Sequence, residues 1–215
     1  MALSRIALLL FAQVATSAYL EFPLLDSNDR PTGFKEGLPT YVNATIDYGQ
    51  GEDKKPLELF LLCTTCTISY IFGNPDDFSL FECSGTEEMV FKEGGKNVTV
   101  EFCNTSLTLT SVNSTDNSET PYSVDFSIGY ISPEFQSLEY FDNFKENMIG
   151  LAPMLTDDQK IMDRQFLYKF TNAKEQKALG LLESYAIDGP TETFALGGNK
   201  EDFEKLVYDG TADGH

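Results

Sequence analysis

Histidine is nearly absent from the sequence: among 215 residues the only one is His215, the last residue. Serine and cysteine nucleophiles that depend on a histidine base require that base inside the fold. Histidine metal sites and histidine proton switches also require an internal histidine. The sequence therefore excludes these classes of site, and it leaves cysteines and carboxylates as the candidates for chemistry.

Basic residues are also scarce, with 15 Lys and Arg against 34 Asp and Glu and a formal net charge of −19. Nucleic acids and anionic membranes carry charge of the same sign, so electrostatic repulsion would oppose their binding. We therefore expect neither as a partner, and we expect no metal or cofactor. The charge suits a soluble protein, including one in an acidic compartment where many carboxylates are protonated.

The sequence has no apolar run long enough to span a bilayer. The run at residues 6–12 follows Arg5 and precedes small residues that end at Ala18. This order predicts a secretory signal over residues 1–18, cleaved after Ala18. The mature chain would have 215 − 18 = 197 residues, which is enough for one domain with a sizeable core. Because the signal contains Arg5, its loss would change the net charge from −19 to about −20.

Four N-x-[ST] sequons occur in the chain, at Asn43, Asn97, Asn104 and Asn113. Each is weak evidence alone. Four of them behind a secretory signal predict N-glycosylation and an extracellular or lumenal location.

The chain has four cysteines, Cys63, Cys66, Cys83 and Cys103. An even number in a secreted chain predicts two disulfides, although the spacing does not determine their pairing. We favour Cys63–Cys66 and Cys83–Cys103, because the second bond closes a loop of about 20 residues, worth roughly 3 kcal/mol. A four-cysteine zinc site is the alternative, but the second pair of cysteines lacks the C-x-x-C spacing.

The rest of the chain is organised around a short apolar run, Leu59–Leu62, that leads into C-x-x-C. Such a run predicts a strand buried on both faces, with reactive side chains at its end. In thioredoxin-like proteins a helix follows this motif directly. Here Tyr70 is followed by Ile71, Phe72 and then Gly-Asn-Pro, which breaks a helix. These residues weigh against a redox function for the two cysteines.

Residues 60–66, with the sequence FLLCTTC and followed by Tyr70, resemble the pepsin-like eukaryotic aspartic peptidase family. In that family three apolar residues lead into D-T-G-S-S, and an aromatic residue follows. The resemblance places Cys63 at the catalytic Asp and matches Thr64 to the Thr. Thr65 replaces the Gly, and Cys66 replaces the first Ser.

Further segments resemble this family in the same order along the chain. A strand is predicted over residues 41–48, and a hairpin over residues 89–102 stands where the family has its flap. Phe91 falls at the flap tyrosine, and Gly94 matches a glycine of the turn. Residues 144–153, FKENMIGLAP, resemble F-D-G-I-L-G-L-A-x-P, and residues 193–199 resemble a strand that ends in L-G-G-x-D. A glycine inside an apolar strand, such as Gly150, lets another backbone approach closely.

The remaining patterns predict strands at 107–109, 122–130 and 179–187, and a polar loop at 111–120. They also predict one helix with a capping box of Thr156 and Gln159. The resemblance implies an all-β fold with a few short helices, a pepsin-like β-barrel lobe. It divides the chain into the signal, a lead segment at 19–37, a first lobe at 38–210 and a tail at 211–215. The lobe's usual interface would be apolar, so we expect a second lobe or a homodimer as partner.

The family's catalysis needs two carboxylates that share one proton. The triplet D-[ST]-G occurs nowhere in this sequence. A thiol at the position of the Asp has a reference pKa near 8.5 and is neutral in acid, and in a disulfide it has no proton to exchange. We therefore predict a catalytically inactive homologue that binds peptide or protein through the former cleft and flap, at Cys63, Thr64, Thr65, Phe91 and Gly94. Two alternatives stay open: an active aspartic endopeptidase, by family membership, and a thiol–disulfide oxidoreductase using Cys63 and Cys66.

Overall fold

The computed structural model describes residues 19–26, 28, 39–47, 58–72, 82–91, 96–113, 115–131, 146–188 and 192–208, and the statements below concern these residues. The predicted signal, Gly94 and the predicted tail lie outside them. Strands dominate the described residues, and the helices are short. The predicted fold class, all-β with a few short helices, is confirmed.

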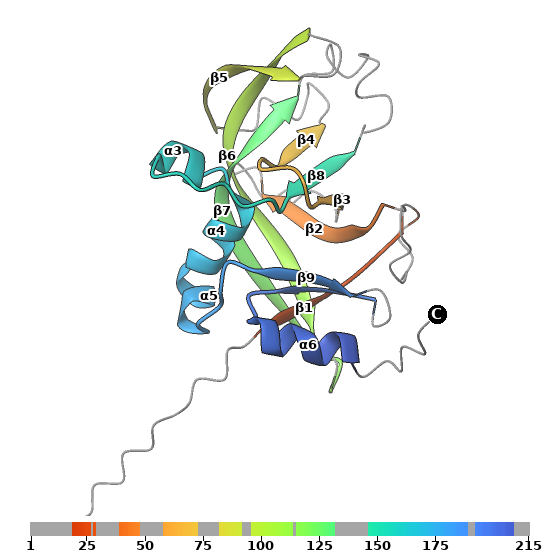
Figure 1. Cartoon of the computed structure of the whole chain (residues 1–215). Coiled ribbons are helices and arrows are strands. Elements are labelled where there is room, and N and C mark those ends of the chain that lie inside the picture. The colour runs from red at the N-terminus through yellow and green to blue at the C-terminus, as the bar shows by residue number, and fades with distance from the viewer. Residues whose placement is uncertain are drawn as a thin grey trace, which may run out of the picture.

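Six strands close into a β-barrel (Figure 1). Their hydrogen-bonded order is β2-β3-β8-β4-β7-β6, and β6 pairs back onto β2 to complete the ring. A further strand, β5, pairs with the first half of β6, along the same edge that β2 uses further on. The strands are β2 (Tyr41–Asp47), β3 (Glu58–Cys63), β4 (Tyr70–Phe72), β5 (Glu82–Phe91), β6 (Lys96–Val112), β7 (Glu119–Ile131) and β8 (Asn147–Gly150).

The longest hairpin of the barrel joins β6 to β7, which pair from Val100↔Ile131 to Val112↔Glu119. The hairpin predicted over residues 89–102 is confirmed as part of β5 and β6. The strand predicted at 107–109 is not a separate strand, because its alternating apolar residues continue β6. The polar loop predicted at 111–120 is shorter than expected, since residues 111 and 112 still pair with β7 and the turn begins at Asn113.

Strand β3 lies between two hydrophobic clusters. Phe60 and Leu62 belong to the larger cluster, and Leu61 belongs to the smaller one. Successive side chains of a strand point to opposite faces, so a wholly apolar strand can be buried on both. All three side chains are buried, which confirms the two-faced burial predicted for this run. Full burial of side chains of this size contributes about 1.5–3 kcal/mol each.

A three-stranded antiparallel sheet, in the order β1-β10-β9, lies at the end of the barrel where the β6–β7 hairpin turns (Figure 1). Its strands are β1 (Leu20–Pro23), β9 (Tyr185–Asp188) and β10 (Thr193–Leu196). Leu20, Phe22, Phe194 and Leu196 join the larger cluster. The strand predicted at 179–187 is wrong in its first half, because α5 ends at Ala178 and β9 begins only at Tyr185.

Helix α6 (Lys200–Tyr208) was not predicted from the sequence. It follows a reciprocal cap: the Asp202 N–H donates to Asn199 Oδ1 at 3.0 Å, and the Asn199 N–H donates to Asp202 Oδ2 at 3.1 Å. This exchange is the arrangement of a capping box, here with Asn and Asp in place of the usual Ser or Thr and Glu or Gln. The sequence pattern N-x-x-D at residues 199–202 therefore carried the signal for this helix.

The single helix predicted after residue 156 is three short helices, α3 (Gln159–Met162), α4 (Phe166–Asn172) and α5 (Lys174–Ala178). Its predicted cap is also wrong. The N-cap residue of α3 is Asp158, which has an extended backbone and whose Oδ1 accepts a hydrogen bond from the Lys160 N–H at 2.9 Å. Thr156 instead accepts from the Asp158 N–H at 3.1 Å.

Tertiary packing accounts for where these helices lie. Helix α4 buries one apolar face, with Phe166, Leu167 and Phe170 in the larger cluster. Helix α5 is attached to β7 by Gln176, which is 1% exposed and donates from Nε2 to the carbonyl oxygen of Ser123 at 2.9 Å. Together α3, α4 and α5 run along one side of β7 (Figure 1).

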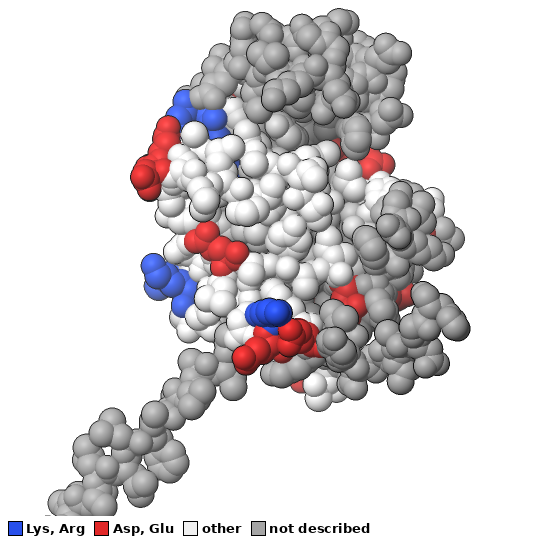
Figure 2. Space-filling view, viewed as in Figure 1, with Lys and Arg blue, Asp and Glu red and all other residues white. Residues whose placement is uncertain are grey.

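The surface of the described residues carries few cations. On the face shown in Figure 2, neutral side chains cover most of the middle around one acidic patch, and Lys and Arg form small separate patches near acidic residues. Among the described helices, none combines the length and apolar character that a membrane crossing requires.

Candidate functional site

The site predicted from the sequence is the loop that follows β3. Strand β8 lies between β3 and β4, parallel to β3 and antiparallel to β4. The chain therefore leaves β3 at Cys63, crosses the end of β8 through residues 64–69, and returns as β4. This ψ-shaped arrangement places the Cys63–Cys66 loop, residues 63–66, at the end of a buried strand, as the sequence predicts.

Three hydrogen bonds from consecutive backbone N–H groups attach this turn of the chain to β8 and the residues after it. The Leu151 N–H donates to the Cys63 carbonyl and the Ala152 N–H to the Cys66 carbonyl, each at 2.9 Å. The Gly150 N–H donates to Ser69 Oγ at 3.0 Å. Ser69 is fully buried, and sequence analysis did not identify it. Buried polar groups are expected to be paired in this way.

Gly150 is required by this close approach of two backbone segments. A Cβ atom added to it would lie 2.6 Å from the carbonyl oxygen of Ile68 and 2.8 Å from that of Cys66. Both are backbone atoms, so the loop itself would have to move. This confirms the role that the sequence suggested for a glycine within this apolar strand.

Both disulfides pair as favoured from the sequence, Cys63 with Cys66 and Cys83 with Cys103. Cys83 and Cys103 lie opposite each other on β5 and β6. All four cysteines are oxidised, so they hold no thiolates for a zinc ion, and the four-cysteine zinc alternative is wrong for this structure. Among the described residues, no cluster of His, Cys, Asp and Glu is suited to hold a metal ion.

The inner side of the Cys63–Cys66 loop rests on the smaller hydrophobic cluster. That cluster contains Leu61, Tyr70 and Met148, with the half-buried Cys63 and Cys66 packed against it. Cys66 Sγ lies 3.3 Å from Met148 Sδ, a contact between two polarisable sulfur atoms. The outer side of the loop consists of Thr64 and Thr65, which are both exposed. The loop thus presents hydroxyl groups to solvent above an apolar support.

Two carboxylates lie near the strands that carry the loop, and each has a partner other than a second carboxylate. Tyr41 OH donates to Glu146 Oε2, and Asn147 Nδ2 donates to Glu58 Oε2, both at 2.5 Å. Burial raises the pKa of Tyr41 well above its usual value, and the hydrogen bond to Glu146 and the charge of that carboxylate raise it further. The hydrogen-bond partners shown for these two carboxylates are thus a tyrosine hydroxyl and a side-chain amide.

The other residues predicted for the cleft and flap are only partly described. Phe91 is the last residue of β5 and lies opposite Lys96 on β6, which places its backbone next to the turn of the predicted flap. Gly94 and the rest of that turn lie outside the described residues. Cys63, Thr64 and Thr65 lie in the loop, and their part in a cleft stays a prediction.

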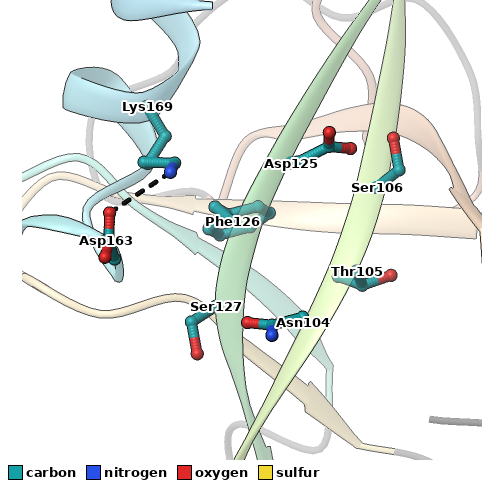
Figure 3. Close-up of a pocket in the computed structure, with 8 residues that line it drawn as sticks. All are labelled: Asn104, Thr105, Ser106, Asp125, Phe126, Ser127, Asp163 and Lys169. Atoms are coloured by element: carbon teal, nitrogen blue, oxygen red, sulfur yellow. Dashed lines mark hydrogen bonds and ion pairs between the residues drawn. The ribbon is translucent and has the colours of Figure 1, made fainter. Parts of the chain in front are cut away.

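Sequence analysis missed a second feature, which we call the polar groove. It is a pocket of about 500 Å³ between the β6–β7 hairpin and the helices. No residue of the Cys63–Cys66 loop lines it. Asp163 and Lys169 form an ion pair at 3.2 Å on its helical side (Figure 3). The residues that line the groove are Asn104, Thr105, Ser106, Asp125, Phe126, Ser127, Asp163 and Lys169.

Comparison with known proteins gives a structural likeness at low sequence identity. No protein-family model matches the chain, and no curated protein matches it. Among solved structures, it is similar to conglutin gamma, a basic 7S globulin from lupine seeds, with a TM-score of 0.47 and 10% sequence identity. The match covers 88% of this chain and 52% of that one, so the chain spans about half the length of the conglutin.

Proposed function

We propose that the chain is a secreted, non-catalytic relative of the first lobe of pepsin-like aspartic peptidases. In this proposal it binds peptide or protein segments at the surface around the Cys63–Cys66 loop. The observation that carries the proposal is the disulfide at the end of β3, at the place where that family has a catalytic carboxylate.

A disulfide supplies neither an acid nor a base, so the loop has no proton to transfer in the way that a carboxylate pair does. Loss of catalytic groups of this kind costs on the order of 10⁴- to 10⁶-fold in rate. The apolar support beneath the loop and its attachment to β8 do not depend on catalysis. A binding function therefore needs only the apolar support and the attachment to β8, both of which the structure contains.

The segment after β8 supports a binding role. The Ala152 N–H donates a hydrogen bond to the loop. Two residues further on, Met154 and Leu155 form an exposed apolar pair. Leu155 is fully exposed, and Gln165 Nε2 donates to the Met154 carbonyl at 3.0 Å. Contiguous exposed apolar patches rimmed by polar groups mark surfaces that bind other chains, and we propose this pair as part of such a surface. With a net charge of −19, the protein favours the approach of basic segments over acidic ones.

Retention of peptides from a random library by the purified full chain tests this proposal. We expect Leu155→Asp to weaken binding, because it places a charge in the apolar pair. Leu182→Asp is the matched control, since Leu182 is also exposed, at 47%, but lies in the segment between α5 and β9. Retention of no peptide, or equal loss in both variants, would contradict a binding surface at the loop.

Two activity assays separate the competing functions. Cleavage of denatured protein at acidic pH, inhibited by pepstatin, would establish the aspartic endopeptidase. Reduction of insulin that is lost in Cys63→Ser would establish the oxidoreductase, which the half-buried C-x-x-C disulfide favours. We expect neither activity. The sequence has no D-[ST]-G triplet for an aspartic peptidase. The described residues directly after the loop, 67–72, contain β4 and no helix whose N-terminus could stabilise a thiolate.

A further inference from the structure

Beyond the proposed binding function, we infer that the polar groove seats the first sugars of an N-linked glycan carried by Asn104 of the same chain. The inference rests on the secretory location proposed above, because N-glycosylation requires it. It does not depend on the Cys63–Cys66 loop, which lines no part of the groove.

Asn104 is positioned to carry a glycan into the groove. It is exposed, it begins the sequon Asn104-Thr105-Ser106, and all three of these residues line the groove. Its strand β6 places it opposite Ser127 on β7, and its side-chain amide points across the hairpin towards Ser127 (Figure 3). The amide nitrogen, which a glycan would occupy, has no hydrogen-bond partner among the described residues.

The lining of the groove suits a sugar. Lys169 offers N–H donors, and Asp125 and Asp163 offer carboxylate acceptors for sugar hydroxyls. Hydrogen bonds to charged groups are stronger than those between neutral groups. Phe126 also lines the groove, with its ring almost fully buried in the larger hydrophobic cluster. A volume of about 500 Å³ lies within the range of about 300–1,000 Å³ that holds small ligands.

Two other sequons, at Asn113 and Asn43, differ from Asn104 in their surroundings. Asn113 lies at the turn between β6 and β7, where its Oδ1 accepts from the Thr115 N–H at 2.8 Å. It borders a smaller pocket of about 280 Å³ whose lining includes Glu21 but no Lys or Arg. Asn43 is half-buried in β2. Asn113 therefore serves as the internal reference, because a glycan there would have no contact with an ion pair such as Asp163–Lys169.

The experiment follows enzymatic removal of glycans from the native full chain, secreted by a eukaryotic host. Mass spectrometry of glycopeptides measures release at Asn104 and Asn113 in the same molecules over time. We expect release at Asn104 to be about tenfold slower, a difference equivalent to ~1.4 kcal/mol in favour of the seated glycan. In the double variant Asp163→Ala/Lys169→Ala, release at Asn104 is expected to rise towards the rate at Asn113.

Controls separate seating of the glycan from other effects. Lys177→Ala, an exposed residue of α5 outside the groove, should leave the slow release at Asn104 unchanged. Denatured protein should lose both glycans at similar rates, and circular dichroism should show that the double variant is folded. Equal release in the native wild type, or protection that persists in a folded double variant, would overturn the inference. A glycan at Asn113 with none at Asn104 would also overturn the inference, but it would support the proposed secretory location. The absence of glycans from all four sequons would overturn both the inference and the secretory location.

Discussion

The Cys63–Cys66 loop and the polar groove are held in place by different kinds of interaction. The loop is attached to β8 by backbone hydrogen bonds, closed by a disulfide and supported by an apolar cluster. The groove is formed by side chains of two strands and a helical segment, with one partly exposed ion pair. Substitutions should therefore cost much more stability in the loop than in the groove. The comparison indicates that one barrel can carry an exposed loop fixed by its backbone and an exposed groove formed only by side chains.

The largest effect is expected for Gly150→Ala. The new Cβ would meet backbone carbonyl oxygens at 2.6 Å and 2.8 Å, and we expect a loss of about 3 kcal/mol in the free energy of unfolding. Urea unfolding measures it. Gly180→Ala is the control, because a Cβ there meets no atom within 4 Å and only the positive φ of 72° is unfavourable, a cost of about 1 kcal/mol. Similar losses for the two variants would refute the close approach at Gly150.

An intermediate effect is expected at alkaline pH from Tyr41. Its pKa is raised in the fold, first by burial and then by Glu146. Above the usual tyrosine pKa of about 10, the folded state holds the phenol proton that the unfolded state has lost. Stability is therefore complete below about pH 10 and falls as pH rises, by at most ~1.4 kcal/mol per pH unit from this group.

Unfolding measured between neutral and alkaline pH tests this effect. Tyr41→Phe should reduce the slope with which stability declines at alkaline pH. Part of the slope should remain, because burial also raises the pKa values of Tyr19 and Tyr185. Glu146→Gln should give an intermediate slope, because it removes the carboxylate charge and retains an amide oxygen as acceptor. An unchanged slope in Tyr41→Phe would show that its phenol is not protected by the fold.

The smallest effect is expected for Lys169→Ala in the groove of the protein without glycan. The side chains of Lys169 and Asp163 are 30% and 42% exposed, and Asp163 keeps a hydrogen bond from Gln159 Nε2 at 3.0 Å. Exposed ion pairs contribute about 0–1 kcal/mol, so the change in unfolding free energy should stay below that. It should shrink further in high salt, which screens surface charges. A loss as large as that of Gly150→Ala would make the ion pair a main support of the fold.

Sequence reasoning succeeded where local pattern was sufficient. The apolar run Leu59–Leu62 identified a strand buried on both faces, and cysteine spacing favoured the disulfides that form. It failed at the helix cap, where Asp158 competes with Thr156 two residues earlier. It also failed where distant residues decide, because the predicted helix breaks into three and Gln176 attaches the last of them to β7.

The amino-acid order alone determined the alternation of strands, the paired cysteines and the glycine within an apolar strand, because each depends on residues close together in the chain. Only the tertiary structure decided how the barrel closes through β2 and β6, and that Ser69 meets Gly150. It also brought Asn104 to a groove with Asp163 and Lys169. These outcomes depend on side chains far apart in sequence, whose meeting depends on how the strands pair and the helices pack.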